Sequence, residues 1–176
     1  QTTYQVYITD TCTGGTIAPT TGPISFTTTC SPFPFTGDTY SSATVVSSFP
    51  FNQTINTQNT CYTDASTLRT GVDLFYRIET TPCTDSITVS LCGSAFDTYL
   101  YIRDEANGTT LFSNDDFCDL QSEVTFKVTP GAVYYVVAEP YTSTDRGDVV
   151  VNISETTSGP VLATSFTNPT CNGTAD

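Results

Sequence analysis

The chain has 176 residues, of which 38% are hydrophobic and only 13% are charged, and its formal net charge is −13. It contains seven cysteines but no histidine, methionine or tryptophan. The lack of histidine excludes a Ser–His–Asp triad, a Cys–His pair and any histidine-bearing zinc site. The five basic residues are scattered, so a nucleic-acid-binding surface is excluded and contact with anionic membranes is disfavoured. No segment approaches the ~20 apolar residues of a membrane helix, and we expect no membrane insertion.

Residues 1–10 predict an amphipathic strand, because Tyr4, Val6 and Ile8 alternate with polar positions and share one face. Residues 11–23 are rich in Thr, Gly and Pro, a composition typical of linkers. We therefore expect residues 1–29 to form a strand and a linker outside the main domain.

Residues 30–155 read as a series of short strands separated by Gly, Pro, Asn and Asp. In 86–92, for example, the apolar residues fall on every second position, as in a half-buried strand. No window of ten residues has a helical stripe. This pattern predicts an all-β, antiparallel sandwich or jelly roll, followed by a Thr/Ser/Asn-rich tail over 156–176. The expected strands are 43–48, 73–79, 86–92, 97–103, 109–112, 123–128, 133–138 and 148–154.

The central strands resemble the bacterial pre-peptidase C-terminal domain family and its cysteine-bearing relatives. The motifs that carry the resemblance occur in the family's order, and they lie at 87–102, 114–118, 122–126 and 130–137. The resemblance covers residues 30–155 and implies a jelly-roll-like sandwich on a secreted or surface protein. Such domains accompany peptidases or other exported enzymes and have no catalysis of their own.

Seven cysteines in this chain indicate an oxidising, extracellular compartment. Because the chain begins at Gln1 rather than Met, we expect a secreted protein whose signal peptide has been removed. Cys83 and Cys92 lie near opposite ends of one expected strand, roughly 27–30 Å apart, which is too far for a disulfide.

The family resemblance implies the disulfides Cys30–Cys61 and Cys92–Cys118. The cysteines left without an assignment are Cys12, Cys83 and Cys171. The odd count leaves one thiol free or bonded to another chain.

Four acidic or amide residues are candidate calcium ligands, namely Asp97, Asn114, Asp115 and Asp116. Calcium binds six to eight hard oxygen ligands, which such loops supply. The alternative is that these residues cap turns and keep strand edges soluble. Calcium is the one cofactor that the sequence suggests. Neighbouring carboxylates in extended chain point apart, so we expect no glycosidase pair and no enzyme activity.

Four Asn-X-Ser/Thr sequons are candidate glycosylation sites, at Asn52, Asn107, Asn152 and Asn172. A chain rich in Thr and Asn also produces such triplets by chance.

Two functions fit these features. In the first, the chain is the repeating subunit of an extracellular filament, and Tyr4, Val6 and Ile8 insert as a donor strand into the next copy. The contrasting expectation is that residues 3–9 pair within their own chain and complete its sheet. In the second, the chain is a glycan- or protein-binding accessory module of a secreted hydrolase.

Overall fold

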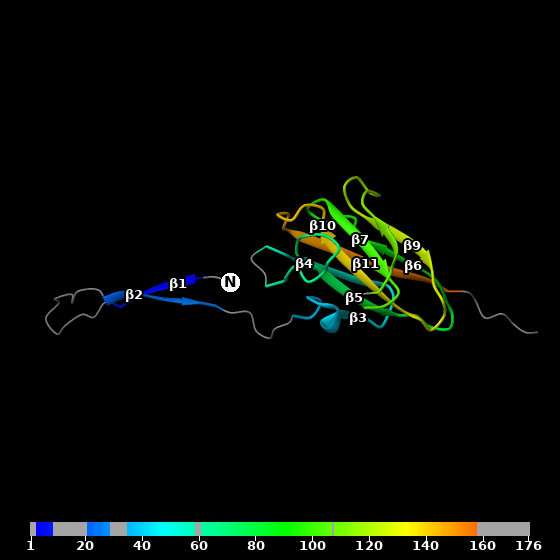
Figure 1. Ribbon diagram of the computed structural model, residues 1–176, viewed down its shortest axis with the longest axis horizontal. Coiled ribbons are helices and arrows are strands. Elements are labelled where there is room, and N and C mark those ends of the chain that lie inside the picture. Colours follow the sequence, from blue (N-terminus) through cyan, green and yellow to red (C-terminus); the bar gives the residue numbers. More distant parts are fainter. Residues whose placement is uncertain (1–2, 9–20, 29–34, 59–60, 107, 158–176) are drawn as a thin grey trace, which may run out of the picture.

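The structure of the chain is a computed structural model that describes residues 3–8, 21–28, 35–58, 61–106 and 108–157 (Figure 1). The described residues form strands β1 to β11 and one short 3-10 helix, η1 (Tyr40–Ser42). No helix in this part of the chain has the length and apolarity that crossing a membrane requires.

Two sheets pack face to face as a β-sandwich (Figure 1), which confirms the predicted fold class. The five-stranded sheet contains, in spatial order, β3 (Thr44–Val46), β5 (Leu74–Glu79), β10 (Val133–Pro140), β7 (Thr98–Arg103) and β8 (Thr110–Asn114). The four-stranded sheet contains β4 (Phe51–Asn56), β11 (Asp148–Thr157), β6 (Thr84–Ser90) and β9 (Glu123–Lys127). All neighbours are antiparallel except β3 and β5, which run parallel.

The core lies between the two sheets and is built from every second residue of their strands. Ile87 and Val89 of β6 are fully buried against Ile102 of β7 and Val136 of β10. Burying one such side chain contributes about 1.5–3 kcal/mol. The other face of β6 is polar, and Thr88 bonds there to the side chain of Thr125 on β9. The alternation seen in the sequence therefore sets which face of each strand turns inward.

Two strands lie where the sequence predicts none. β4 follows Pro50, and β2 (Thr21–Thr27) contains Gly22 and Pro23. Proline and glycine normally mark turns, so they hide the short apolar alternations of these strands. Each of these strands has one neighbouring strand among the described residues, so each is an edge strand. Edge strands tolerate proline and glycine.

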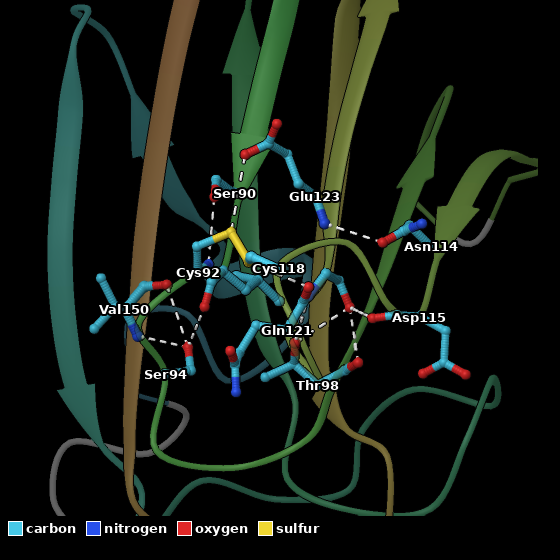
Figure 2. The surroundings of a disulfide bond; sticks show 12 residues. Ser90, Cys92, Ser94, Thr98, Asn114, Asp115, Cys118, Gln121, Glu123 and Val150 are labelled. Carbon is cyan, nitrogen blue, oxygen red and sulfur yellow. Dashed lines mark hydrogen bonds between the residues drawn. A yellow bond between two sulfur atoms is a disulfide. The ribbon is translucent and has the colours of Figure 1, made fainter.

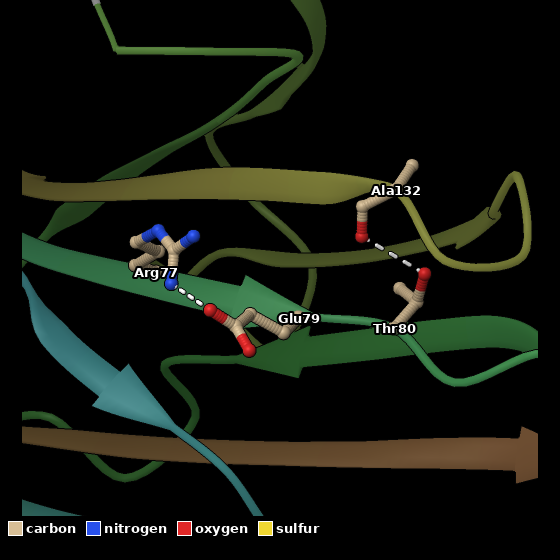
Figure 3. A network of polar contacts seen from close by, with 4 residues as sticks. All are labelled: Arg77, Glu79, Thr80 and Ala132. Carbon is tan, nitrogen blue, oxygen red and sulfur yellow. Dashed lines mark hydrogen bonds and ion pairs between the residues drawn. The ribbon is translucent and has the colours of Figure 1, made fainter.

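Polar contacts on the outside of the five-stranded sheet add little to the sandwich. Arg77 and Glu79 form an ion pair on β5 (Figure 3), and both side chains reach solvent, where such a pair contributes ~0–1 kcal/mol. Just beyond β5, the amide and hydroxyl of Thr80 both donate to the carbonyl of Ala132, at 3.0 and 2.9 Å. These two bonds hold the end of β5 beside the start of β10.

Candidate functional site

The first candidate site is a two-stranded hairpin that lies outside the sandwich (Figure 1). β1 (Thr3–Ile8) pairs antiparallel with β2, which places Tyr4 opposite Phe26 and Val6 opposite Ile24. The rings of Tyr4 and Phe26 stack with their centroids 5.3 Å apart. The structure thus differs from both expectations. β1 is not a lone donor strand, and its partner in the chain is β2 rather than a strand of the sandwich.

One face of this hairpin is apolar and exposed. The exposed fractions on this face are 49% for Tyr4, 41% for Val6, 55% for Ile8, 56% for Ile24 and 51% for Phe26. The opposite face carries polar contacts, such as the hydroxyl bond between Thr3 and Thr27. Neither strand contains a charged residue. The predicted contact residues Tyr4, Val6 and Ile8 therefore belong to a larger face that includes two residues of β2.

An exposed apolar face is unusual on a hairpin that stands by itself. An isolated two-stranded hairpin is marginally stable in water, because it has no core of its own. Contiguous exposed apolar residues are typical of surfaces that bind another molecule. The sequence did not reveal Ile24 and Phe26, although their spacing of two was a usable signal.

The second candidate site is a cluster of three carboxylates. Asp97, Asp115 and Asp116 each place an oxygen within 4.8 Å of the others. Asn114, the fourth predicted ligand, turns away, because its side-chain oxygen accepts from the amide of Glu123 at 3.1 Å (Figure 2).

Repulsion and partial burial dominate the electrostatics of this cluster. The Oδ1 atoms of Asp97 and Asp115 are buried and have no hydrogen-bond partner among the residues that the structure describes. Desolvation raises the pKa of Asp97, and the charges of Asp115 and Asp116 raise it further. Desolvation and the charge of Asp116 raise the pKa of Asp115 in the same way. Such a group of carboxylate oxygens can take up a proton or supply part of a calcium shell.

A disulfide holds the loop that carries this cluster. Cys92 follows β6 in one sheet and Cys118 lies in the loop after β8 of the other, with their Cα atoms 5.9 Å apart (Figure 2). This is the pairing that the family resemblance implied. Beside it, the hydroxyl of Ser122 lies 2.7 Å from the carbonyls of both Thr98 and Asp115. The disulfide and these contacts fix the acidic loop to both sheets.

The remaining cysteines are only partly described. Cys61 is disulfide-bonded, whereas Cys83 is an exposed free thiol. Cys12, Cys30 and Cys171 lie outside the described residues, and the Cys30–Cys61 pairing stays a prediction.

Two of the predicted sequons meet on the outer face of the four-stranded sheet. Asn52 on β4 lies directly opposite Asn152 on β11. The side chain of Asn52 is exposed and that of Asn152 is half-buried. Asn107 and Asn172 lie outside the described residues.

A third feature is a hollow of 420 Å³ above the outer face of the five-stranded sheet. Its walls are Thr39, Tyr40, Ser41, Ala65, Ala106 and Tyr135. Tyr40 forms part of the wall because its ring packs against Phe75 and Tyr135, and its hydroxyl accepts from Arg103 at 2.7 Å. Hydroxyl groups and aromatic rings around a hollow of this volume can accommodate a small polar ligand.

No family model matches the chain, and no curated protein matches it. The resemblance to the pre-peptidase C-terminal domain therefore stays a prediction. Two solved structures of family 6 carbohydrate-binding modules are similar at a TM-score of 0.32. One, CsCBM6-3 from Clostridium stercorarium in complex with cellobiose, is 17% identical over 52% of this chain and 72% of its own. The other, from a study of binding sub-sites, is 18% identical over 61% of this chain and 82% of its own. Likeness at this level carries no functional argument.

Proposed function

We propose that the chain is a non-enzymatic extracellular assembly module that joins copies of itself head to tail through the β1–β2 hairpin. The observation that carries this proposal is the exposed apolar face of the hairpin, formed by Tyr4, Val6 and Ile8 with Ile24 and Phe26. The proposal keeps the predicted contact residues but replaces the single donor strand by a hairpin.

Charge favours the hairpin as the contact between copies. A net charge of −13 makes two sandwiches repel each other, and the repulsion falls off over a Debye length of ~8 Å at physiological salt. The strands of the hairpin are uncharged and lie outside the sandwich. The hairpin can therefore reach a neighbouring copy with less repulsion than any sandwich-to-sandwich contact.

Strand β8 is the proposed acceptor. It is an edge strand, so one side of its backbone has no partner strand among the described residues, and Leu111 and Phe112 on it are 40% and 43% exposed. Phe117 and Leu120, in the loop that follows, are more exposed still. An added strand gains main-chain hydrogen bonds at such an edge, while apolar side chains supply contact area. Because the hairpin and β8 are different surfaces, the contact does not close on itself and extends as a fibre.

Light scattering after size-exclusion chromatography tests the proposal with matched variants. Val6→Asp places a charge on the apolar face and should leave a monomer. Gln5→Asp adds the same charge to the opposite face of the same strand and should assemble like the unmodified chain. Equal assembly by Val6→Asp, or equal loss in Gln5→Asp, would contradict a role for the apolar face.

Mixing two variants identifies the acceptor. Val6→Asp retains β8 but has an altered hairpin, whereas Leu111→Asp retains the hairpin but has an altered β8. Each alone should be monomeric, and their mixture should stop at a dimer. A dimer formed by the unmodified chain alone would instead indicate that hairpins pair with each other.

A glycan-binding accessory role is the second candidate, and the hydroxyl-lined hollow favours it. A glycan array is the direct test. Ala106→Trp fills the hollow and should abolish binding of any sugar that the unmodified chain retains. If the unmodified chain retains no sugar, this second candidate fails and the assembly proposal is unaffected.

A further inference from the structure

Two buried carboxyl groups lie under the segment of residues 61–72, next to the hollow that Tyr40 and Ala65 line. Asp73 immediately precedes β5 and is 0% exposed, and Glu139 lies in β10 and is 2% exposed. Buried carboxylates are normally neutralised by a cation. The described part of the chain provides neither group with an Arg or Lys partner.

One oxygen of each carboxyl group accepts hydrogen bonds that hold the segment to the sheet. Oδ2 of Asp73 accepts from the backbone amides of Ala65 and Ser66, at 2.6 and 2.5 Å. The hydroxyl of Ser66 donates to Oε1 of Glu139 at 2.6 Å. Ser66 therefore joins both carboxyl groups.

The other oxygen of each carboxyl group is buried. In the part of the chain that the structure describes, Oδ1 of Asp73 and Oε2 of Glu139 have no hydrogen-bond partner. The two carboxyl groups lie side by side, because β5 pairs with β10 at Leu74 and Ala138 and because Ser66 bonds to both groups. Two ionised carboxylates in this position would repel in a medium of low dielectric, whereas one proton between them converts the repulsion into a hydrogen bond.

We propose that Asp73 and Glu139 share one proton, which latches residues 61–72 onto the outer face of the five-stranded sheet, and that loss of this proton releases the segment. The proposal is independent of the assembly function.

The titration of the pair supports this geometry. Burial raises the pKa of Glu139 to about 8, and the nearby charge of Asp73 adds to the rise against the opposing hydrogen bond from Ser66. Burial also raises the pKa of Asp73, against its backbone hydrogen bonds. Folded-state pKa values above those of the unfolded chain mean that stabilisation is complete below the unfolded values and is lost as pH rises through the folded ones. The latch should therefore open in mildly alkaline solution.

Other ionisable groups face the pair from three elements. Asp64, in the segment itself, adds a charge that raises the pKa of both carboxyls. Burial raises the pKa of Tyr40 of η1 against the hydrogen bond and the positive charge of Arg103, and the charges of Asp73 and Glu139 add smaller increases. Burial and then the charge of Glu139 raise the pKa of Tyr101 of β7. Tyr101 reaches about 12, so its phenol stays protonated where the latch opens.

Two residues of the segment, Arg69 and Gly71, pack against side chains of the neighbouring surface. The guanidinium of Arg69 lies over the rings of Tyr99 and Tyr141, 4.8 and 4.3 Å from their centroids. Gly71, with a φ of +154°, packs so closely that a Cβ there would lie 2.6 Å from Pro140. Release of the segment would expose the peptide bond after Arg69.

Trypsin cleavage of the full chain measures how often the segment is released from the sheet. The rate of cutting after Arg69 is divided by the rate after Arg146, which cancels the pH dependence of trypsin itself. For a segment released by loss of one proton, this ratio should rise by up to about tenfold per pH unit between the pKa of the released carboxyl group and that of the latched pair, and it should level off above the latter. A ratio that does not change between pH 6 and 9 would overturn the proposal.

Substitutions of the two carboxyl groups test whether the rise of the cleavage ratio with pH depends on the shared proton. In Glu139→Gln the amide donates to Oδ1 of Asp73 at any pH, so the ratio should stay low throughout. Asp73→Asn supplies the reciprocal donor and decides the question if the first variant does not fold. Asp85→Asn removes an exposed carboxylate and should retain the rise of the unmodified chain. A rise of unchanged size in Glu139→Gln or Asp73→Asn would overturn the latch.

Discussion

Asp97 and Asp115 oppose folding at neutral pH, because burial and the charges of neighbouring carboxylates raise the pKa values of both groups. Their raised folded-state pKa values mean that stability falls as pH rises through those values. Asp115→Asn removes one charge and supplies a donor to a buried oxygen. We expect its melting temperature at pH 7 to rise by about 4 °C, the shift that ~1 kcal/mol gives in a domain of this size. A decrease, measured by circular dichroism, would show that the carboxylate stabilises the loop.

The same substitution tests whether the cluster binds calcium. Three carboxylates supply part of the six to eight oxygens that Ca²⁺ requires. We expect millimolar calcium to raise the melting temperature of the unmodified chain and to leave that of Asp115→Asn unchanged. Equal responses from the two proteins would place any calcium effect elsewhere.

At the scale of elements, the Cys92–Cys118 disulfide connects the end of β6 to the loop after β8 and spans 26 residues of sequence. Closing a loop of this length contributes ~2–4 kcal/mol by restricting the unfolded chain. Cys92→Ser combined with Cys118→Ser should lower the melting temperature by roughly 10 °C. Cys83→Ser alters an exposed free thiol and should leave it unchanged. Equal melting temperatures for the double variant and the unmodified chain would contradict a stabilising disulfide.

How far the elements could be predicted depended on how clearly their side chains alternate. β6 and β10 have long apolar patterns because they form the sandwich interior, and both were predicted. β2 was missed because Gly22 and Pro23 interrupt its alternation, and with it two residues of the apolar face of the hairpin, Ile24 and Phe26.

The candidate sites were also predicted only in part, because they combine residues that lie far apart in the sequence. The sequence named Asp97 and Asp115 as candidate ligands because of their chemistry. They come together because β7 and β8 are neighbours, and Asp97 precedes β7 where Asp115 follows β8. Glu139 was missed, although a charged residue within the apolar run of β10 was a signal. Its partner Asp73 lies 66 positions earlier, and only the pairing of β5 with β10 brings the two together.

At the scale of the whole molecule, raising the salt concentration should promote assembly, because salt screens the repulsion between negatively charged copies. Copies with a net charge of −13 repel, whereas the hairpin contact is apolar and uncharged. Raising salt from ~0.02 to ~0.5 M shortens the Debye length severalfold and should therefore promote assembly. Light scattering at constant protein concentration measures this, and dissociation by salt would indicate a contact made by ion pairs.

Hydrogen exchange of the β1 amides tests the central claim most directly, because it reports whether the hairpin has a partner. An undocked two-stranded hairpin protects its amides weakly. We predict that protection of residues 3–8 increases with protein concentration in the unmodified chain and stays low at every concentration in Val6→Asp. Protection that is the same at all concentrations in both proteins would contradict assembly through the hairpin.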